Sequence, residues 1–435
     1  MTRLLVLANL GAEEGEAWRE AARTPRVAAA RALFGALFGE GAELVAEDGV
    51  RRASPHAEPA FPWCAAADAP TGAGAARPST TATATDDAPA AADASDDAPG
   101  GIAWLGDEAA RETLARLGAR WRGAPPATAM ALHDKAFAAP ASGPAVAPRI
   151  TCYAAEALAP GAPRSATLSD VQARIDAWPA WMRAHACLKP RLGTSGRGRL
   201  HLRGGRVADA APRAALERAL DRLAARGGAV LEPWLERTVD LSVAFHAGAR
   251  GAGGGALALL GSLRAITSAS GAPRGHRGEI DARGRVFSGT SWDDAARGAA
   301  AELVAAASAA GYGGPCAVDA FAYLDRGGAA PVERLRPVVE LNARFTTGIA
   351  ALGALRRSRV AIRHALGLAP GERVAFVVAS CAPEGGWHEH VAAMRARGSA
   401  PALVPVPTCA EAGSADAAIV AAREAAALDE LCAAL

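Results

Sequence analysis

The amino-acid sequence predicts an α/β protein that is divided into several domains. With 435 residues, the chain is longer than one hydrophobic core usually supports, so about two to four domains are expected. Apolar runs of strand length alternate with alanine-rich segments of helical length, beginning with 3–9 and 25–38. This alternation is typical of a sheet whose strands are connected by helices.

Charge and cysteine content narrow the class of protein. The formal net charge of +2 argues against a surface devoted to nucleic acid or to an acidic membrane. No apolar run reaches the roughly 18 residues that a membrane-spanning helix needs. The seven cysteines form no C-x-x-C pair and are odd in number, which favours reduced thiols and a cytoplasmic location.

The N-terminal part predicts an open α/β sheet that is interrupted by an insertion. A second strand is expected at 44–46, and no G-x-G-x-x-G motif points to a dinucleotide site. Residues 65–100 are rich in Ala, Thr, Asp, Pro and Ser and contain almost no large apolar side chain. Such a segment buries too little apolar surface to offset the entropy of ordering, so we expect it to be disordered.

Periodicity predicts the elements that follow. Helices are expected at 107–117 with Asp107 as N-cap, at 127–139, from Ser169 to 178, at 214–225 and at 296–310. Strands are expected at 187–189, 200–202, 229–235, 239–245, 256–263, 316–324, 338–342 and 374–378. Residues 264–294 are rich in Arg, Gly and Ser and predict a loop, and a small α/β segment closes the chain.

Two residue types are so rare that their positions are informative. Among 47 basic residues, only Lys135 and Lys189 are lysine, and Asn9 and Asn342 are the two asparagines. A chain that uses arginine wherever either residue will do keeps lysine where a compact ammonium charge is needed. We therefore expect both lysines to bind a ligand.

Lys189 begins a glycine-rich loop that is suited to phosphate. Glycines at 193, 196 and 198 let backbone N–H groups converge on an anion, and Thr194 and Ser195 lie between them. From Lys189 to Arg206 there are six basic residues and no acidic one. Nucleic-acid binding is the less favoured alternative, because no aromatic residues alternate with these cations.

A candidate metal site lies further along the chain. Residues two apart on a strand share a face, so Glu340 and Asn342 project together. Asp319 lies on the preceding strand and reaches the same face if the two strands are antiparallel. Two carboxylates and an amide oxygen suit Mg²⁺. The alternative is a solvated sheet face, which the scarcity of asparagine disfavours.

The motifs in residues 127–350 together resemble the ATP-grasp superfamily, and they occur in the family's order. Lys135 stands in a D-K pair, and Lys189 with its glycine loop resembles the phosphate-covering loop. The segment from Glu232 to Leu235 resembles the one that meets adenine. Glu340 to Arg344, E-L-N-A-R, resembles the family's E-x-N-x-R motif, with alanine where proline is common.

The resemblance implies a fold and a division of the chain. It implies an ATP-grasp fold with an N-terminal open-sheet domain over 1–126 and two α+β subdomains over 127–245 and 246–365. The second of these subdomains would hold the metal site. A small α/β appendage would occupy 366–435.

The resemblance also implies residue roles. ATP would be bound by Lys135, Lys189, Gly193, Thr194, Ser195, Gly196, Glu232, Leu235 and Asp240. Mg²⁺, or Mn²⁺ in its place, would be bound by Asp319, Glu340 and Asn342. Arg344 and Lys189 would be catalytic, stabilising the transferred phosphoryl group. The implied reaction joins a carboxylate to an amine through an acyl phosphate, with release of ADP and phosphate.

Several alternatives remain open on the sequence alone. A carboxylate–thiol ligase or a phosphotransferase would use the same fold, and a nucleotide-binding regulatory module would lack catalysis. The intact set of lysines and acids argues against the last. We expect small-molecule carboxylate and amine substrates, with Arg264 and Arg274 as candidate carboxylate contacts. No nucleic acid or membrane is expected as a partner, and a homodimer is possible.

Overall fold

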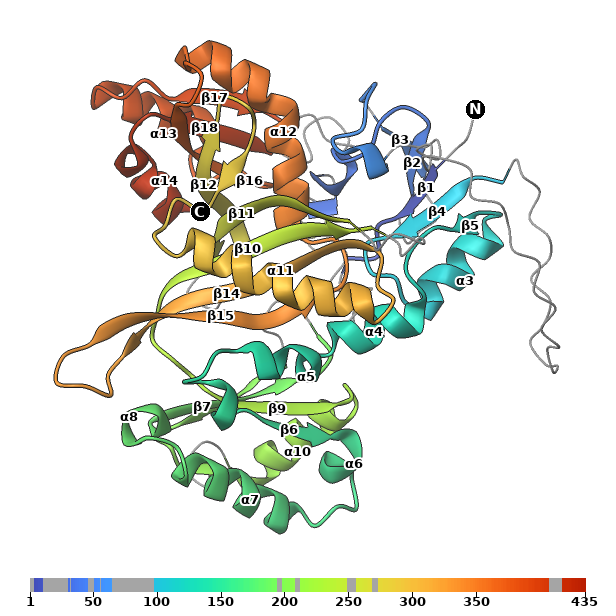
Figure 1. The fold of residues 1–435 in the computed structure, drawn as a ribbon, viewed down its shortest axis with the longest axis vertical. Helices are drawn as coiled ribbons and strands as arrows, with labels where there is room; N and C mark the ends of the chain where they lie inside the picture. Colours follow the sequence, from blue (N-terminus) through green and yellow to red (C-terminus); the bar gives the residue numbers. More distant parts are fainter. Residues whose placement is uncertain are drawn as a thin grey trace.

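A computed structural model gives the arrangement of the chain (Figure 1). It describes residues 4–10, 30–31, 33–45, 51–54, 56–64, 98–193, 198–207, 212–248, 256–267, 273–406 and 417–435. The insertion predicted over 65–100 lies outside these residues apart from its last three. The described residues form sheets of five, nine and four strands with helices packed on them, so the predicted α/β class is confirmed. None of the described helices is long and apolar enough to cross a bilayer.

The five-stranded sheet is built from residues between Leu4 and Trp121, and its strand order is β3-β2-β1-β4-β5. Its strands are β1 (Leu4–Leu7), β2 (Ala42–Val45), β3 (Arg51–Ala53), β4 (Gly100–Ala103) and β5 (Arg120–Trp121). The apolar β1 is buried and lies between β2 and β4, parallel to both. Helix α3 (Glu108–Arg116) follows β4, and the Asp107 side chain accepts a hydrogen bond from the Ala110 amide at 2.8 Å, as the N-cap prediction requires.

The four-stranded sheet is antiparallel and covered by helices on one face. Its order is β6-β9-β7-β8. The strands are β6 (Thr151–Ala154), β7 (His185–Pro190), β8 (Leu200–Arg203) and β9 (Gly228–Pro233), and the covering helices are α6 (Ala155–Leu158), α7 (Arg164–Asp176), α8 (Ala180–Arg183) and α10 (Arg213–Ala224). Leu188, Leu202 and Leu231 pack beneath these helices. Alternation then turns Lys189 and Glu232 to the opposite face of the sheet.

The nine-stranded sheet forms the centre of the molecule (Figure 1). Its strands are β10 (Arg237–Ala247), β11 (Leu257–Thr267), β12 (Pro273–Asp281), β13 (Val286–Phe287), β14 (Gly314–Asp325), β15 (Val332–Asn342), β16 (Arg373–Ala379), β17 (Ala402–Pro405) and β18 (Ala418–Ala422). Helix α11 (Asp293–Ala309) packs on one face against Val243 and Val318. Helix α12 (Thr347–Leu366) packs on the other against Leu263 and Ala317.

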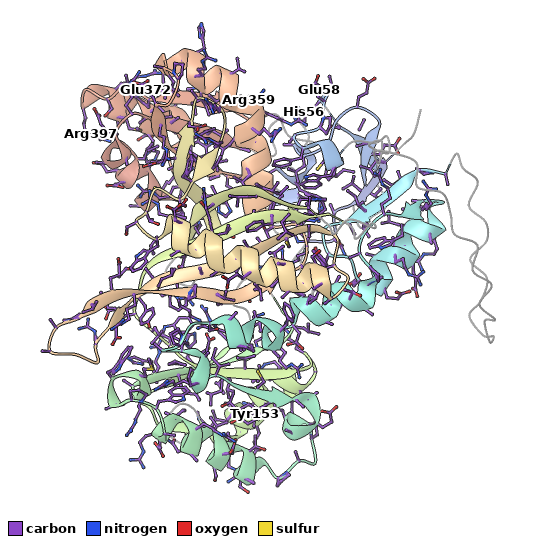
Figure 2. All side chains as sticks on the ribbon, in the orientation of Figure 1. His56, Glu58, Tyr153, Arg359, Glu372 and Arg397 are labelled. Atoms are coloured by element: carbon purple, nitrogen blue, oxygen red, sulfur yellow. The ribbon has the colours of Figure 1, made fainter. Side chains whose placement is uncertain are left out.

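Helix α12 also joins the nine-stranded sheet to the N-terminal domain. A Cβ atom on Gly353 would lie 2.3 Å from Leu37 Cδ2, so a larger residue here would force the Leu37 side chain to shift. Arg357 donates hydrogen bonds to the carbonyl oxygens of Ala36 and Phe38. Figure 2 shows how far the structure extends: Tyr153, in β6 of the four-stranded sheet, lies toward one end, and Glu372 and Arg397 lie toward the other.

Three predicted elements differ from the structure. The loop expected over 264–294 is wrong, because that range contains the end of β11, β12 and β13. The glycines of β12 made it look like a loop in the sequence. A Cβ on Gly275 would lie 2.8 Å from a carbonyl oxygen of β16, and one on Gly278 would lie 2.4 Å from a carbonyl oxygen of β13. The helix expected over 127–139 breaks at Asp134 into α4 (Pro126–His133) and α5 (Lys135–Ala138). Ser169 lies inside α7, which begins at Arg164 after a proline.

The divisions of the chain also fall at other places than expected. The four-stranded sheet ends at Pro233, and β10 belongs to the nine-stranded sheet, so the boundary expected at 245 falls within a strand. Strands β16, β17 and β18 continue the nine-stranded sheet beyond β12. The C-terminal segment 366–435 therefore shares a sheet with the central part. Helices α13 (Gly386–Ala396) and α14 (Asp429–Ala434) complete it.

Candidate active site

The predicted site residues converge where the four-stranded sheet meets β14 and β15 of the nine-stranded sheet. Asp319 on β14 lies directly opposite Glu340 on β15, and Ala317 lies opposite Asn342. Directly opposed residues of antiparallel strands project from the same face. The predicted antiparallel pairing is confirmed, and it places two carboxylates and one amide together.

The two carboxylates have opposite electrostatic environments. Asp319 accepts hydrogen bonds from Ser242 Oγ to Oδ1 at 2.9 Å and from Asn342 Nδ2 to Oδ2 at 3.0 Å. Burial, and next the negative charge of Glu340, raise the pKa of Asp319. Burial also acts to raise the pKa of Glu340, but the charges of Lys135 and Lys189 outweigh it and lower that pKa. One carboxylate is thus compensated by the lysines, whereas the charged form of the other stays destabilised.

Lys135 connects the acid pair to the root of the glycine loop. Its Nζ lies 3.0 Å from Glu340 Oε2 and donates to the Gly193 carbonyl oxygen at 2.8 Å. The preceding Asp134 caps α5 by accepting from the Ala136 amide and also binds the Arg191 guanidinium, with Arg191 Nε 2.9 Å from Oδ2. The D-K pair therefore holds the segment between Lys189 and Gly193. Thr194, Ser195 and Gly196 lie outside the described residues.

Lys189 belongs to a buried group of three charges that the sequence did not reveal in full. It forms an ion pair with Glu232 Oε1, while Arg336 Nη2 from β15 lies 2.8 Å from Glu232 Oε2. Burial would raise the pKa of Glu232, but Arg336 and Lys189 outweigh it and lower that pKa to about 2. Both oxygens of the residue expected near adenine are thus bound by cations of the chain.

Arg344 lies between the acid pair and the N-terminal domain. It donates from Nη2 to Asn342 Oδ1 at 3.0 Å and from Nη1 to the Phe345 carbonyl oxygen at 2.8 Å. Its guanidinium carbon lies 5.9 Å from the centroid of the Trp104 ring, and the Phe345 amide donates to the Trp104 carbonyl oxygen at 3.1 Å. The C-terminal end of β4 therefore adjoins the site.

The other rare asparagine lies at this same end of the N-terminal sheet. Asn9 Nδ2 donates to the Leu105 carbonyl oxygen at 3.0 Å, and the Leu105 amide donates to Asn9 Oδ1 at 3.1 Å. These two bonds join the ends of β1 and β4. Crevices outside the carboxyl ends of strands are the usual ligand sites of open α/β sheets.

His133 is a further buried residue beside the site. It ends α4, two residues before Lys135, and is 2% exposed. Burial and the charges of Arg344 and Lys135 lower its pKa to about 3. The imidazole is therefore neutral at physiological pH. The sequence offered only its place in H-D-K as a signal.

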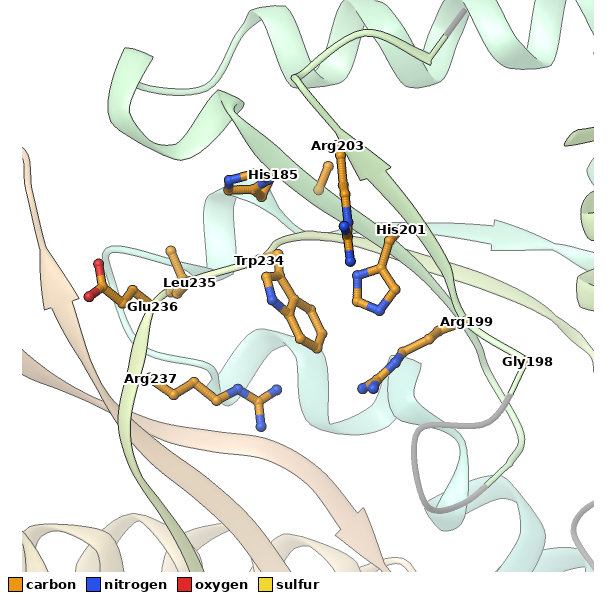
Figure 3. Close-up of a pocket in the computed structure, with 10 residues that line it drawn as sticks. His185, Gly198, Arg199, His201, Arg203, Trp234, Leu235, Glu236 and Arg237 are labelled. Atoms are coloured by element: carbon orange, nitrogen blue, oxygen red, sulfur yellow. The ribbon is translucent and has the colours of Figure 1, made fainter. Parts of the chain in front are cut away.

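An open pocket of about 930 Å³ lies at the outer end of the four-stranded sheet. Figure 3 shows Trp234 at its centre, with the guanidinium carbons of Arg199 and Arg237 4.9 Å and 5.1 Å from the ring centroid and His201 edge-on to the ring. Leu235 lines the pocket. Asp240, also expected to bind ATP, lies beside it with Oδ1 2.6 Å from Arg237 Nη1.

Of the two arginines expected to contact substrate, Arg264 lies on the face of the sheet opposite to the acid pair. Leu263 is opposite Ser242, which binds Asp319, so the next residue, Arg264, projects from the other face of the sheet. There it is paired in register with Arg277 and lies near Asp429. Arg274 is exposed near the beginning of β12. The structure therefore turns Arg264 away from the acid pair.

The chemistry of the acid pair fits a hard divalent cation. Among the described residues, no three His, Cys, Asp or Glu side chains gather as a metal site, so the candidate is the set of two carboxylates and one amide. The repulsion that raises the pKa of Asp319 is what a bound cation would relieve. Oxygen donors of this kind suit Mg²⁺.

Comparisons with known proteins give structural similarity and no sequence match. No family model and none of the curated proteins match the sequence. The ADP complex of purK, N5-carboxyaminoimidazole ribonucleotide synthetase, matches with TM-score 0.47 and 14% identity, over 99% of this chain and 95% of that one. D-cycloserine synthetase DcsG matches with TM-score 0.40 and 15% identity, over 83% and 99%. The N5-carboxyaminoimidazole ribonucleotide synthetase of Thermus thermophilus matches with TM-score 0.42 and 17% identity, over 77% and 81%. At this level of similarity, the residues of the site itself must carry any functional assignment.

Proposed function

We propose that the chain is an ATP-dependent carboxylate–amine ligase of the ATP-grasp type. The observation that carries the proposal is the convergence of both lysines on two carboxylates, Glu340 and Glu232, where the two sheets meet. Lys135 and Lys189 are 54 positions apart in a chain that otherwise uses arginine, and each pairs with one of these carboxylates. Chance placement of two solvated lysines would not produce this arrangement.

The lysines would bind the phosphates of ATP. An ammonium group has three N–H donors. Lys135 uses donors on Glu340 and Gly193, and Lys189 binds Glu232. The remaining donors are available to phosphate oxygens. Trp234 and Leu235 would border the nucleoside at the outer pocket.

Asp319, Glu340 and Asn342 would hold Mg²⁺. When bound, the ion supplies positive charge to the phosphates during phosphoryl transfer. Asp319 must be ionised to serve as a ligand, and its raised pKa makes binding stronger as the pH rises. Asn342 Oδ1 already accepts from Arg344, so the two groups would be held in register.

The proposed reaction has two steps that balance in atoms and charge. A substrate carboxylate oxygen attacks the γ-phosphorus of ATP, the bond to the β-phosphate oxygen breaks, and ADP leaves. A neutral amine then attacks the acyl carbon, phosphate leaves, and the amine nitrogen loses a proton. Arg344 would stabilise the negative charge that develops in both steps.

A screen for turnover tests the proposal. The protein would be incubated with ATP, Mg²⁺ and pools of amino acids and other small carboxylic acids, and release of ADP and of phosphate would be measured. Hydroxylamine would trap an acyl phosphate as a hydroxamate even where the natural amine is absent. Arg397→Gln is a matched control, because Arg397 lies at the C-cap of α13 and its ion pair is with Glu430.

The outcomes separate the alternatives. Hydroxamate formation supports the ligase, whereas ADP with a stable phosphorylated product indicates a phosphotransferase. Turnover that depends on a thiol and is not replaced by amines indicates a carboxylate–thiol ligase. ATP binding without turnover in any pool favours a regulatory module. A melting temperature and a calorimetric signal that MgATP leaves unchanged would contradict every one of these nucleotide functions.

A further inference from the structure

Arg336 is an arginine in an unusually apolar place. It lies on β15 opposite Phe321 and is 1% exposed. Its guanidinium carbon lies 5.5 Å from the centroid of the Phe321 ring. Burying a guanidinium is costly unless it is paired and hydrogen-bonded. Its partners therefore indicate what it does.

Among the residues that the structure describes, Arg336 has one charged partner, and that partner belongs to the other sheet. Nη2 lies 2.8 Å from Glu232 Oε2 on β9 and 3.3 Å from Ser142 Oγ, and Nε donates to the Val338 carbonyl oxygen at 3.2 Å. Nη1 has no acceptor among the described residues. The one ion pair of this guanidinium thus crosses from the nine-stranded to the four-stranded sheet.

Glu232 is shared between two cations. Its Oε1 binds Lys189, its Oε2 binds Arg336, and the carboxylate is 3% exposed. The group of Lys189, Glu232 and Arg336 therefore carries a net positive charge in a buried place. Without the guanidinium, Lys189 and Glu232 would form a neutral pair, and the full carboxylate charge would hold the ammonium.

We propose that Arg336 is a positioning residue that makes Lys189 available to an anionic ligand by taking a share of the Glu232 carboxylate. The inference rests on the proposed function for the identity of that ligand, the phosphates of ATP. The effect of Arg336 on Lys189 does not depend on which ligand binds, so it can be tested without ATP. The competing explanation is that Arg336 only fastens the two sheets together.

The two lysines make a direct measurement possible. Acetic anhydride would be used to label the folded protein, and acetylation at Lys189 and Lys135 would be quantified by mass spectrometry as a ratio. In Arg336→Met, the whole Glu232 carboxylate would hold the Lys189 ammonium group, so we expect labelling at Lys189 to fall about tenfold relative to Lys135. Arg336→Lys, which keeps a cation, should restore most of the ratio.

Arg334→Met is the matched control. Arg334 lies two residues away on β15, but its side chain is 56% exposed and pairs with Asp325. It should leave the labelling ratio unchanged within about twofold. A structural fastening role predicts instead a lower melting temperature for Arg336→Met with an unchanged ratio, and that result would overturn the proposal. Should Arg336→Met fail to fold, Arg336→Lys provides the test. Its shorter side chain holds Glu232 less closely, so the ratio of labelling at Lys189 to that at Lys135 should fall by a smaller amount.

ATP binding gives the second measurement. Calorimetry with ATP and Mg²⁺ should show about tenfold weaker binding for Arg336→Met, and the double variant with Glu232→Gln should bind no more weakly than Glu232→Gln alone. If the fold-losses in ATP affinity of the two single variants multiply in the double variant, Arg336 does not act through Glu232, and the proposal is contradicted. If the unmodified protein binds no ATP, the proposed function fails, while the labelling ratio still decides whether Arg336 controls Lys189.

Discussion

The two lysines of the chain occupy comparable positions but are compensated in different ways. Lys135 pairs with Glu340, a carboxylate that itself belongs to the candidate metal site. Lys189 pairs with Glu232, which has no metal to bind and is held by a second cation, Arg336. Glu340 would therefore share its charge between Lys135 and a bound metal ion, whereas Glu232 shares its charge between Lys189 and Arg336.

This difference indicates how each end responds to a ligand. We call the part of the site around Lys135 and Glu340 the inner end, and the part around Lys189 and Glu232 the outer end. Glu340 can exchange part of its interaction with Lys135 for a bound cation, so the inner end can rearrange when a ligand binds. Both oxygens of Glu232 already bind cations of the chain, so the outer end is ordered before a ligand binds. Pre-built charge of this kind lowers the reorganisation needed when a phosphate binds.

The largest expected effect concerns stability. Glu232→Gln leaves Lys189 and Arg336 buried without their shared carboxylate, which should cost about 3–5 kcal/mol of unfolding free energy. Glu340→Gln removes the partner of Lys135 but also relieves the repulsion on Asp319, and these effects oppose each other, so its cost should be smaller than that of Glu232→Gln. Thermal and urea unfolding of both variants at neutral pH in metal-free buffer measure the difference. Equal losses would erase the distinction between the two ends.

The next effect concerns turnover. Lys189→Arg replaces a compact ammonium with a wider planar group in a place that is 9% exposed and already holds Arg336. We expect kcat to fall at least about tenfold, or about 1.4 kcal/mol in the barrier. Lys135→Arg should lose less, because that side chain reaches its partners from the end of a helix. A Lys189→Arg variant that matches the wild type would refute the argument from lysine scarcity.

The sequence predicted this site where its residues were rare or alternated simply. Lys135, Lys189 and Asn342 were informative by scarcity, and the period of two placed Glu340 beside Asn342. Arg336 was not predicted, because it is one of many arginines and its even spacing from Glu340 was the only signal.

The same alternation explains the errors. Arg264 follows Leu263, whose face was unknown until the register of β10 and β11 was established. The pairing of β12 depended on glycines that admit a neighbouring strand. Register and close approach depend on residues distant in sequence, so local pattern does not supply them.

A smaller effect should appear in the metal dependence. Glu340→Gln keeps the shape of the side chain but removes one charge from the acid pair, so raising Mg²⁺ should restore part of the lost activity. Lys189→Arg acts at the other end and should not respond to Mg²⁺. ADP release measured against Mg²⁺ concentration for both variants tests this contrast. Full activity of Glu340→Gln at low Mg²⁺ would remove Glu340 from the metal site.

The smallest expected effect is a pH dependence that belongs to the inner end alone. Burial and Glu340 raise the pKa of Asp319 in the folded chain, so the folded chain binds this proton more tightly than the unfolded chain does. The resulting stability is present at low pH and is lost as the pH rises from about 4 through the raised pKa. Glu232, whose pKa is lowered to about 2, contributes in the opposite sense and is already ionised over that range.

In metal-free buffer, Asp319→Asn should therefore flatten the decline in melting temperature between acid and neutral pH. Asp325→Asn, in the hairpin of β14 and β15, should leave that decline in place. Mg²⁺ should reverse the decline in the wild type and in Asp325→Asn, because the ion binds the ionised pair that both of them keep. If the melting temperature of Asp319→Asn declines with pH as it does in the wild type, the decline comes from other groups and the raised pKa of Asp319 is refuted.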